Sequence, residues 1–320
     1  MHFVFFILIT ISFQLSGQEH YVEEVIAYGV RPGPELWKVT NGENALWIMG
    51  TLSPLPKKMT WHSELVEAVI EDSQAYLLPP SVSADVGFFQ GLSLATSTIG
   101  IKKNPNKQKL KDILPTDIYT RWLVLKKKYL GKNKSIEKTR PIFASGKLFD
   151  KAISKIGLTY NTKVGKKITK MAKKNKLEFI SPTIKIDLNK SKSAIKKFKK
   201  SQISDLDCFV KTLDTLETDL KAMHSRAHAW AAGEVSKLKA LQINNQNKAC
   251  TSAILDNEIA KDMGILDIRS RLRQTWIDEA SKTLTNNKST FAILPISTLL
   301  DNENVLNILI EKGYTVEVPD

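Results

Sequence analysis

The sequence predicts an α/β protein of the α+β type, in which the N- and C-terminal parts form a central mixed sheet around a large helical insertion. Short apolar runs typical of buried strands occur near both ends of the chain, each beside an amphipathic helix. The residues between the two ends have helical periodicity. We expect one domain, with an α/β core from residues 18–82 and 266–320 and a mainly helical, lysine-rich insert at residues 83–265.

The N-terminal part of the core begins with a predicted hairpin. Leu36–Val39 forms its first strand, Asn41–Gly42 forms the turn, and Ala45–Thr51 forms a second, almost wholly apolar strand. A strand without polar alternation is expected at the centre of a sheet, where both of its faces are covered. A helix over residues 61–74 and a strand over Ala75–Leu78 are expected next.

The C-terminal part of the core repeats this order of elements. An amphipathic pattern predicts a helix over Ile268–Leu284, and the apolar run Phe291–Leu294 predicts a short buried strand. A second helix is expected over residues 303–312, followed by an alternating strand at Tyr314–Val318. Gly313 stands where glycine commonly ends a helix.

Positive charge is concentrated in the middle of the chain. Residues 101–200 hold 30 Lys and Arg against 6 Asp and Glu, a net charge of +24, whereas the whole chain carries +14. This region is either a solvated helical surface or a face for an anionic membrane or polysaccharide. Nucleic acid is not expected as a partner, because the basic residues are not interleaved with aromatic ones in any recognisable motif.

The N-terminus has the pattern of a secretory signal peptide. Phe3–Phe13 is an uncharged apolar run of about eleven residues, which is short of the roughly 20 that a membrane-spanning helix needs. Small and polar residues follow, so cleavage is expected after Gly17. Residues 1–17 therefore predict a periplasmic or secreted protein. The alternative is a buried first strand.

The chain has two cysteines, Cys208 and Cys250. An even number in an exported chain is compatible with one disulfide bond, and the alternative is a pair of buried reduced thiols. The two residues are too far apart in sequence for a CxxC redox pair and too few for a structural zinc site.

Both ends of the chain resemble the TraB/GumN family, whose relatives include the Tiki metalloproteases. The resemblance rests on the order and spacing of short segments that lie mainly at the two ends of the chain. These segments are Leu36–Val39, Leu46–Thr51, Leu55–Pro56, Arg273 with Trp276, and Lys312–Val316, with Trp230–Glu234 as a weaker match in the middle.

The resemblance implies a metal site, but this sequence departs from the family at the residues that would form it. Members of the family carry a Gly-Thr-x-His turn, a second Gly-x-x-His turn, a carboxylate after the third strand and an arginine. Here Ser53 and Thr298 stand at the two histidine positions, Pro79 and Pro80 end the third strand, and only Arg273 matches. A metal of the family type, and any other cofactor, is therefore not expected, because neutral hydroxyls are weak ligands.

Three functions remain open at this stage. The first is a non-catalytic member that binds an unknown ligand or protein of the cell envelope; the second is a hydrolase with a rebuilt site; the third is a basic adaptor for anionic envelope surfaces. The candidate ligand-binding residues are Gly50, Thr51, Ser53, Arg273, Trp276 and Thr298. His224 and His228 lie four apart on one helix face, a spacing that can bind metal, although a surface pair is the expected reading.

Overall fold

The computed structural model describes residues 33–84, 100–160, 163–186, 191–200, 205–241, 246–255, 258–262, 264–301 and 305–319. The predicted signal peptide at residues 1–17 lies outside these described residues.

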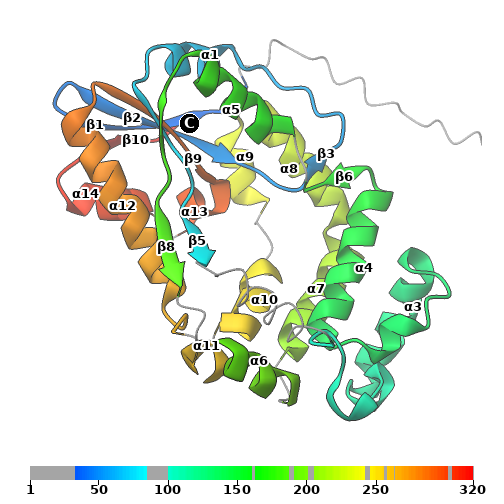
Figure 1. Cartoon of the computed structure of the whole chain (residues 1–320). Coiled ribbons are helices and arrows are strands. Elements are labelled where there is room, and N and C mark those ends of the chain that lie inside the picture. Colours follow the sequence, from blue (N-terminus) through cyan, green and yellow to red (C-terminus); the bar gives the residue numbers. More distant parts are fainter. Residues whose placement is uncertain are drawn as a thin grey trace, which may run out of the picture. The chain divides into compact units, whose positions relative to one another are not determined.

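A mixed sheet of six strands forms the framework, in the order β10-β1-β2-β9-β4-β7 (Figure 1). The two pairings of β1 are antiparallel, and the pairings of β2 with β9, β9 with β4, and β4 with β7 are parallel. The predicted mixed sheet of N- and C-terminal strands is thus confirmed. Its strands are β1 (Leu36–Asn41), β2 (Asn44–Thr51), β4 (Ala75–Leu77), β7 (Glu178–Ile180), β9 (Ser289–Pro295) and β10 (Thr315–Glu317).

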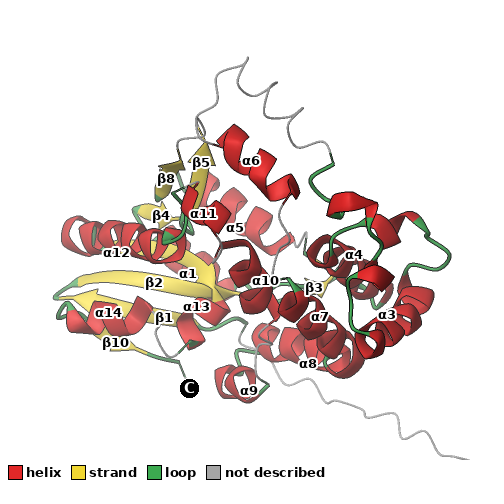
Figure 2. Cartoon of the chain, turned by 90° about the horizontal axis from the view of Figure 1, so that it is seen from below, coloured by secondary structure: helices red, strands yellow, loops and turns green. Residues whose placement is uncertain are grey.

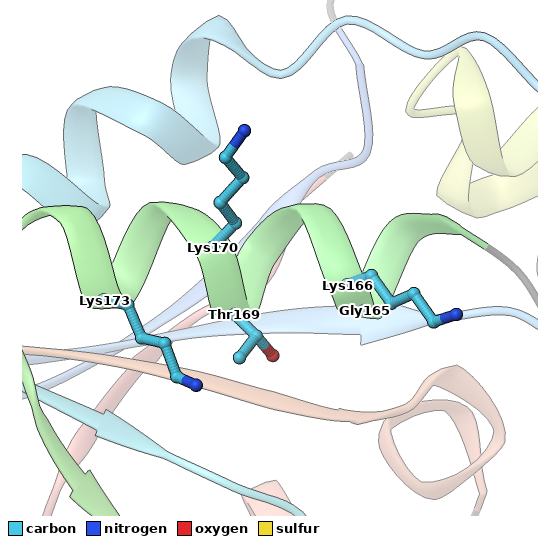
Figure 3. A pocket seen from close by; sticks show the side chains of 5 residues that line it. All are labelled: Gly165, Lys166, Thr169, Lys170 and Lys173. Carbon is cyan, nitrogen blue, oxygen red and sulfur yellow. The ribbon is translucent and has the colours of Figure 1, made fainter.

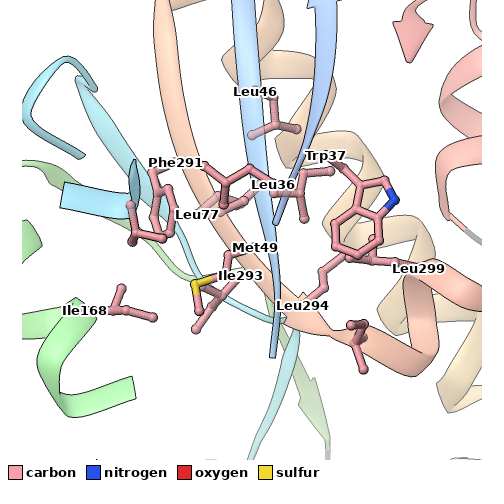
Figure 4. Close-up of a cluster of buried hydrophobic side chains, with 14 of the residues drawn as sticks. Leu36, Trp37, Leu46, Met49, Leu77, Ile168, Phe291, Ile293, Leu294 and Leu299 are labelled. Atoms are coloured by element: carbon pink, nitrogen blue, oxygen red, sulfur yellow. The ribbon is translucent and has the colours of Figure 1, made fainter. Parts of the chain in front are cut away.

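The most apolar strands lie at the centre of this sheet. Leu46, Ile48 and Met49 of β2 have no exposed surface, and neither has Phe291 of β9. These side chains belong to one large cluster of buried hydrophobic residues, part of which is drawn in Figure 4. Strand β2 is apolar along its length because side chains on both faces of the sheet are buried there.

Helices cover both faces of the sheet. The helices α1 (Glu64–Glu71) and α5 (Lys163–Lys174) contact each other on one side, and α12 (Ile268–Asn286) and α14 (Val305–Glu311) lie on the other (Figure 1, Figure 2). Between β9 and α14 the chain forms the short helix α13 (Ile296–Leu300), which packs against β2 and β9.

The middle of the chain contributes more to the sheet than its helical pattern indicates. Strand β7 lies in this region and pairs with β4, with Tyr76 opposite Phe179. Helix α5 adds Val164, Ile168 and Ala172 to the same core as the central strands. These residues recur every four positions, so they form one apolar face that packs on the sheet.

A second hydrophobic cluster lies among the helices of the middle region. Trp122, Phe209 and Leu148 are fully buried there, on three different helices. These are α3 (Thr116–Tyr129), α7 (Leu206–Thr218) and α4 (Pro141–Lys155). None of the helices in the described part of the chain has the length and apolarity that a membrane crossing requires.

The remaining elements are two small sheets, five further helices and three 3-10 turns of the described part of the chain. Two small sheets pair β3 (Leu55–Pro56) with β6 (Leu158–Thr159), and β5 (Ser81–Ala84) with β8 (Thr183–Ile186). The other helices are α6 (Ser191–Lys200), α8 (Leu220–Ala231), α9 (Val235–Ala240), α10 (Gln246–Leu255) and α11 (Glu258–Asp262), with 3-10 turns at Pro105–Lys107, Leu110–Asp112 and Ser135–Lys138.

The two cysteines lie on neighbouring helices. The sulfur atoms of Cys208 on α7 and Cys250 on α10 are 2.00 Å apart, which is a disulfide distance. Cys208 itself is fully buried.

Replacing both cysteines by alanine (C208A/C250A) should lower the free energy of unfolding by about 2–4 kcal/mol, because the crosslink restricts the unfolded chain. The two residues are 42 positions apart, so the loop it closes is long. Urea denaturation measures the change. A reducing agent should cause the same loss in the wild type and none in the double variant, and equal stability of all samples would contradict a crosslink.

Candidate functional site at the ends of strands β2 and β9

Two turns that lie far apart in the sequence meet at one edge of the sheet. Strands β2 and β9 run parallel, with register from Ala45 opposite Ser289 to Thr51 opposite Pro295. The Thr51 hydroxyl donates a hydrogen bond of 3.1 Å to the Leu294 carbonyl, which holds the two strand ends together. Since parallel strands end at the same edge, the segments that follow them, with Ser53 and Thr298, lie at that edge.

Gly50 stands where three elements converge. Its carbonyl accepts a buried hydrogen bond of 2.7 Å from the indole nitrogen of Trp230 on α8. A Cβ atom at this position would lie 2.8 Å from Ile296 Cγ1 and 3.0 Å from Trp37 Cζ3. Glycine is therefore required by close packing, and the Trp230 segment that weakly matched the family is joined directly to the end of β2.

The hydroxyl-bearing residues at this edge differ in exposure. Ser53 is exposed, whereas Thr298 on α13 is half-buried. Neither hydroxyl carries a charge, so both can exchange hydrogen bonds with a ligand but make poor metal ligands.

Helix α12, which crosses the sheet, carries the other two predicted ligand-binding residues. Trp276 is fully buried, and its indole nitrogen has no hydrogen-bond partner among the described residues. Arg273 is half-buried one turn earlier on the same helix. The strand pairing thus places Gly50 and Thr51 beside Leu294 and Pro295, and Ser53 and Thr298 lie in the segments that follow. The packing of α12 on the sheet adds Trp276 to the hydrophobic core.

The described histidines have separate neighbours. His224 Nε2 lies 3.0 Å from the Ile156 carbonyl, so one ring nitrogen is taken up by the backbone, while His228 is exposed. His62 Nδ1 lies 3.6 Å from Glu64 just before α1. Within the described ranges, no three His, Cys, Asp or Glu side chains come close enough to hold a metal.

A chain of aromatic and cationic contacts links α5 to this edge. The Lys167 ammonium lies 5.1 Å from the centre of the Trp61 ring, and the Trp61 ring lies 6.0 Å from that of Trp230. Lys167 also pairs with Glu67 of α1 at 3.4 Å. Because the Trp230 indole bonds Gly50, these contacts fix the position of α5 relative to the end of β2.

An open hollow of about 410 Å³ lies along one flank of α5, and sequence reasoning missed it (Figure 3). Its described lining consists of Gly165, Lys166, Thr169, Lys170 and Lys173. The only signal in the sequence was the spacing of the lysines, which places them on one side of the helix.

Replacing Gly50 by alanine should lower the free energy of unfolding by about 1–3 kcal/mol, because the added methyl group overpacks a fixed contact. Gly146 on α4 is a matched control, since nothing lies within 4 Å of a Cβ atom there. Gly146→Ala should be neutral or stabilising, by up to roughly 1 kcal/mol. Chemical denaturation checks both variants, and an unchanged Gly50→Ala protein would contradict the packing described here.

Comparison with known proteins gives one match. No curated protein and no solved structure matches this chain. The model of the TraB/PrgY/gumN family matches residues 35–318, a range that begins just before β1 and ends just after β10. The chain belongs to the TraB/PrgY/gumN family.

Proposed function

We propose that this protein is an exported, non-catalytic member of its family, which binds a ligand or a protein of the cell envelope at the edge where β2 and β9 end. The observation that carries the proposal is the pairing of these two strands, which brings Ser53 and Thr298 to one edge of the sheet. The resemblance places metal-binding histidines at these two positions, and both are hydroxyls here.

The chemistry of the edge supports binding rather than metal-dependent hydrolysis. A metal lowers the pKa of its bound water and so makes a nucleophile at neutral pH. Two neutral hydroxyls and a pair of prolines after the third strand supply neither the imidazoles nor the carboxylate for such a centre. They do supply hydrogen-bond donors and acceptors that can orient a polar ligand.

Two features support export. The run Phe3–Phe13 and the small residues after it have the pattern of a signal peptide. The Cys208 and Cys250 sulfur atoms lie at a disulfide distance, and such bonds persist in oxidising compartments.

The purified protein should show no stoichiometric binding of Mn²⁺, Co²⁺ or Zn²⁺ and no metal-dependent peptide cleavage. Isothermal titration calorimetry and a fluorogenic peptide library measure the two quantities, with circular dichroism as the control for folding. One tightly bound metal per chain, together with cleavage that a chelator abolishes, would favour the hydrolase with a rebuilt site and contradict this proposal.

Restoring the two histidines should create a metal site if Ser53 and Thr298 occupy the assigned positions. The double variant S53H/T298H should bind Co²⁺ at least tenfold more tightly than the wild type, because two imidazoles would then share one edge. The matched control is S53H/S297H, which moves one imidazole to the exposed neighbouring position on α13. Equal Co²⁺ affinity of both double variants would show that the positions were assigned wrongly.

A further inference from the structure

The flank of α5 that lines the hollow carries positive charge without a counter-ion. Lys166, Lys170 and Lys173 form no ion pair and no hydrogen bond with any described side chain. Lysines at positions i and i+4 of a helix repel each other, so Lys166 and Lys170 are kept together at a cost. A bound anion would remove that repulsion.

The acidic residue Glu67 on the neighbouring helix α1 pairs with a lysine outside the lining of the hollow. Glu67 of α1 pairs with Lys167, and the Lys167 ammonium also lies over the Trp61 ring. The Ser63 hydroxyl, with Lys167 also contributing, lowers the pKa of the Glu67 carboxyl. The Glu67 carboxylate therefore pairs with Lys167, and it forms no ion pair with Lys166, Lys170 or Lys173.

A buried hydroxyl without a hydrogen-bond partner lies against the same flank. Tyr76 of β4 has no exposed surface, and its hydroxyl has no hydrogen-bond partner among the described side chains. The side chain of Thr169, which lines the hollow, is the polar neighbour of this hydroxyl on α5. Burial raises the pKa of Tyr76 to about 12, so the hydroxyl stays protonated and remains a donor at neutral pH.

The number of lysines indicates the charge of the ligand. Lys166 and Lys173 are seven positions apart, which corresponds to about 10 Å along a helix that rises 1.5 Å per residue. Three ammonium groups along that length carry more positive charge than a single phosphate balances, which favours a ligand with two phosphate groups. Lysine binds phosphate as a point charge, and the Thr169 hydroxyl adds a neutral donor.

We propose that the hollow on α5 binds a molecule carrying at least two phosphate groups, either free or as the head group of a lipid, held by Lys166, Lys170 and Lys173 with Thr169 at its floor. This site rests on α5 and does not depend on the roles of Ser53 and Thr298. The proposed function can therefore fail while this site stands, and the reverse also holds.

The test is titration of the full chain with inorganic pyrophosphate, by isothermal titration calorimetry at two salt concentrations. The wild type should bind one pyrophosphate per chain saturably. The triple variant K166Q/K170Q/K173Q should bind at least tenfold more weakly. The matched control K132Q/K134Q/K138Q removes the same charge from exposed lysines of the same basic region and should change the affinity less than twofold.

A further variant tests whether pyrophosphate binding needs an uncharged hydroxyl of the hollow as well as the positive charge of the lysines. Thr169→Val keeps the charge and nearly the same shape, and it should weaken pyrophosphate binding several-fold while thermal unfolding shows an intact fold. Vesicles containing a lipid with a diphosphate head group distinguish a lipid source from a free one, since only a lipid ligand would bring the chain to the vesicle.

Three outcomes would overturn the proposal. One is the absence of saturable pyrophosphate binding by the wild type. Another is equal weakening by the two triple variants, which would show attraction to the basic region as a whole. The third is binding only to vesicles of a simple anionic lipid such as phosphatidylglycerol, lost equally in both triple variants, which would identify a membrane-adsorbing surface instead of a site.

Discussion

The parallel pairing of β2 with β9 is the constraint on which the rest of the structure depends. It joins Thr51 to Leu294, 243 residues away, so the chain must close a very long loop before the sheet can form. The gain that offsets this closure is the burial of two almost wholly apolar strands against each other and under helices on both faces. The same pairing aligns the two strand ends, and it is therefore the reason that Ser53 and Thr298 share one edge.

The sequence predicted which residues form strands better than it predicted which strands pair with each other. The apolar runs at Ala45–Thr51 and Phe291–Leu294 are strong signals because a strand covered on both faces needs no polar alternation. The place of β7 in the main sheet could not be predicted, since the pairing with β4 depends on tertiary contacts. The two hydroxyl positions of the candidate site followed from the resemblance alone, and the strand register supplies a physical reason for linking them.

Some lysines in the middle of the chain pair with acidic side chains and others do not. The number of lysines in the sequence does not show which ones are paired. Lys126 pairs with Glu137 at 2.5 Å, Lys197 pairs with Asp262 at 2.5 Å, and the lysines of the α5 hollow have no acidic partner among the described side chains. The difference arises from which residues the fold places opposite each helix flank. The hollow was missed in the sequence for the same reason, because the packing of α5 beside Tyr76 of β4 depends on tertiary contacts.

The most direct test of the account is the register of β2 and β9 in solution. Nuclear Overhauser contacts between backbone protons, recorded on deuterated protein, report which residues of two strands face each other. The account predicts contacts of a parallel pair, with Trp47 beside Phe291 and Met49 beside Ile293. An antiparallel pattern, a shifted register or the absence of contacts between these strands would contradict it, because the two turns would then have no common edge.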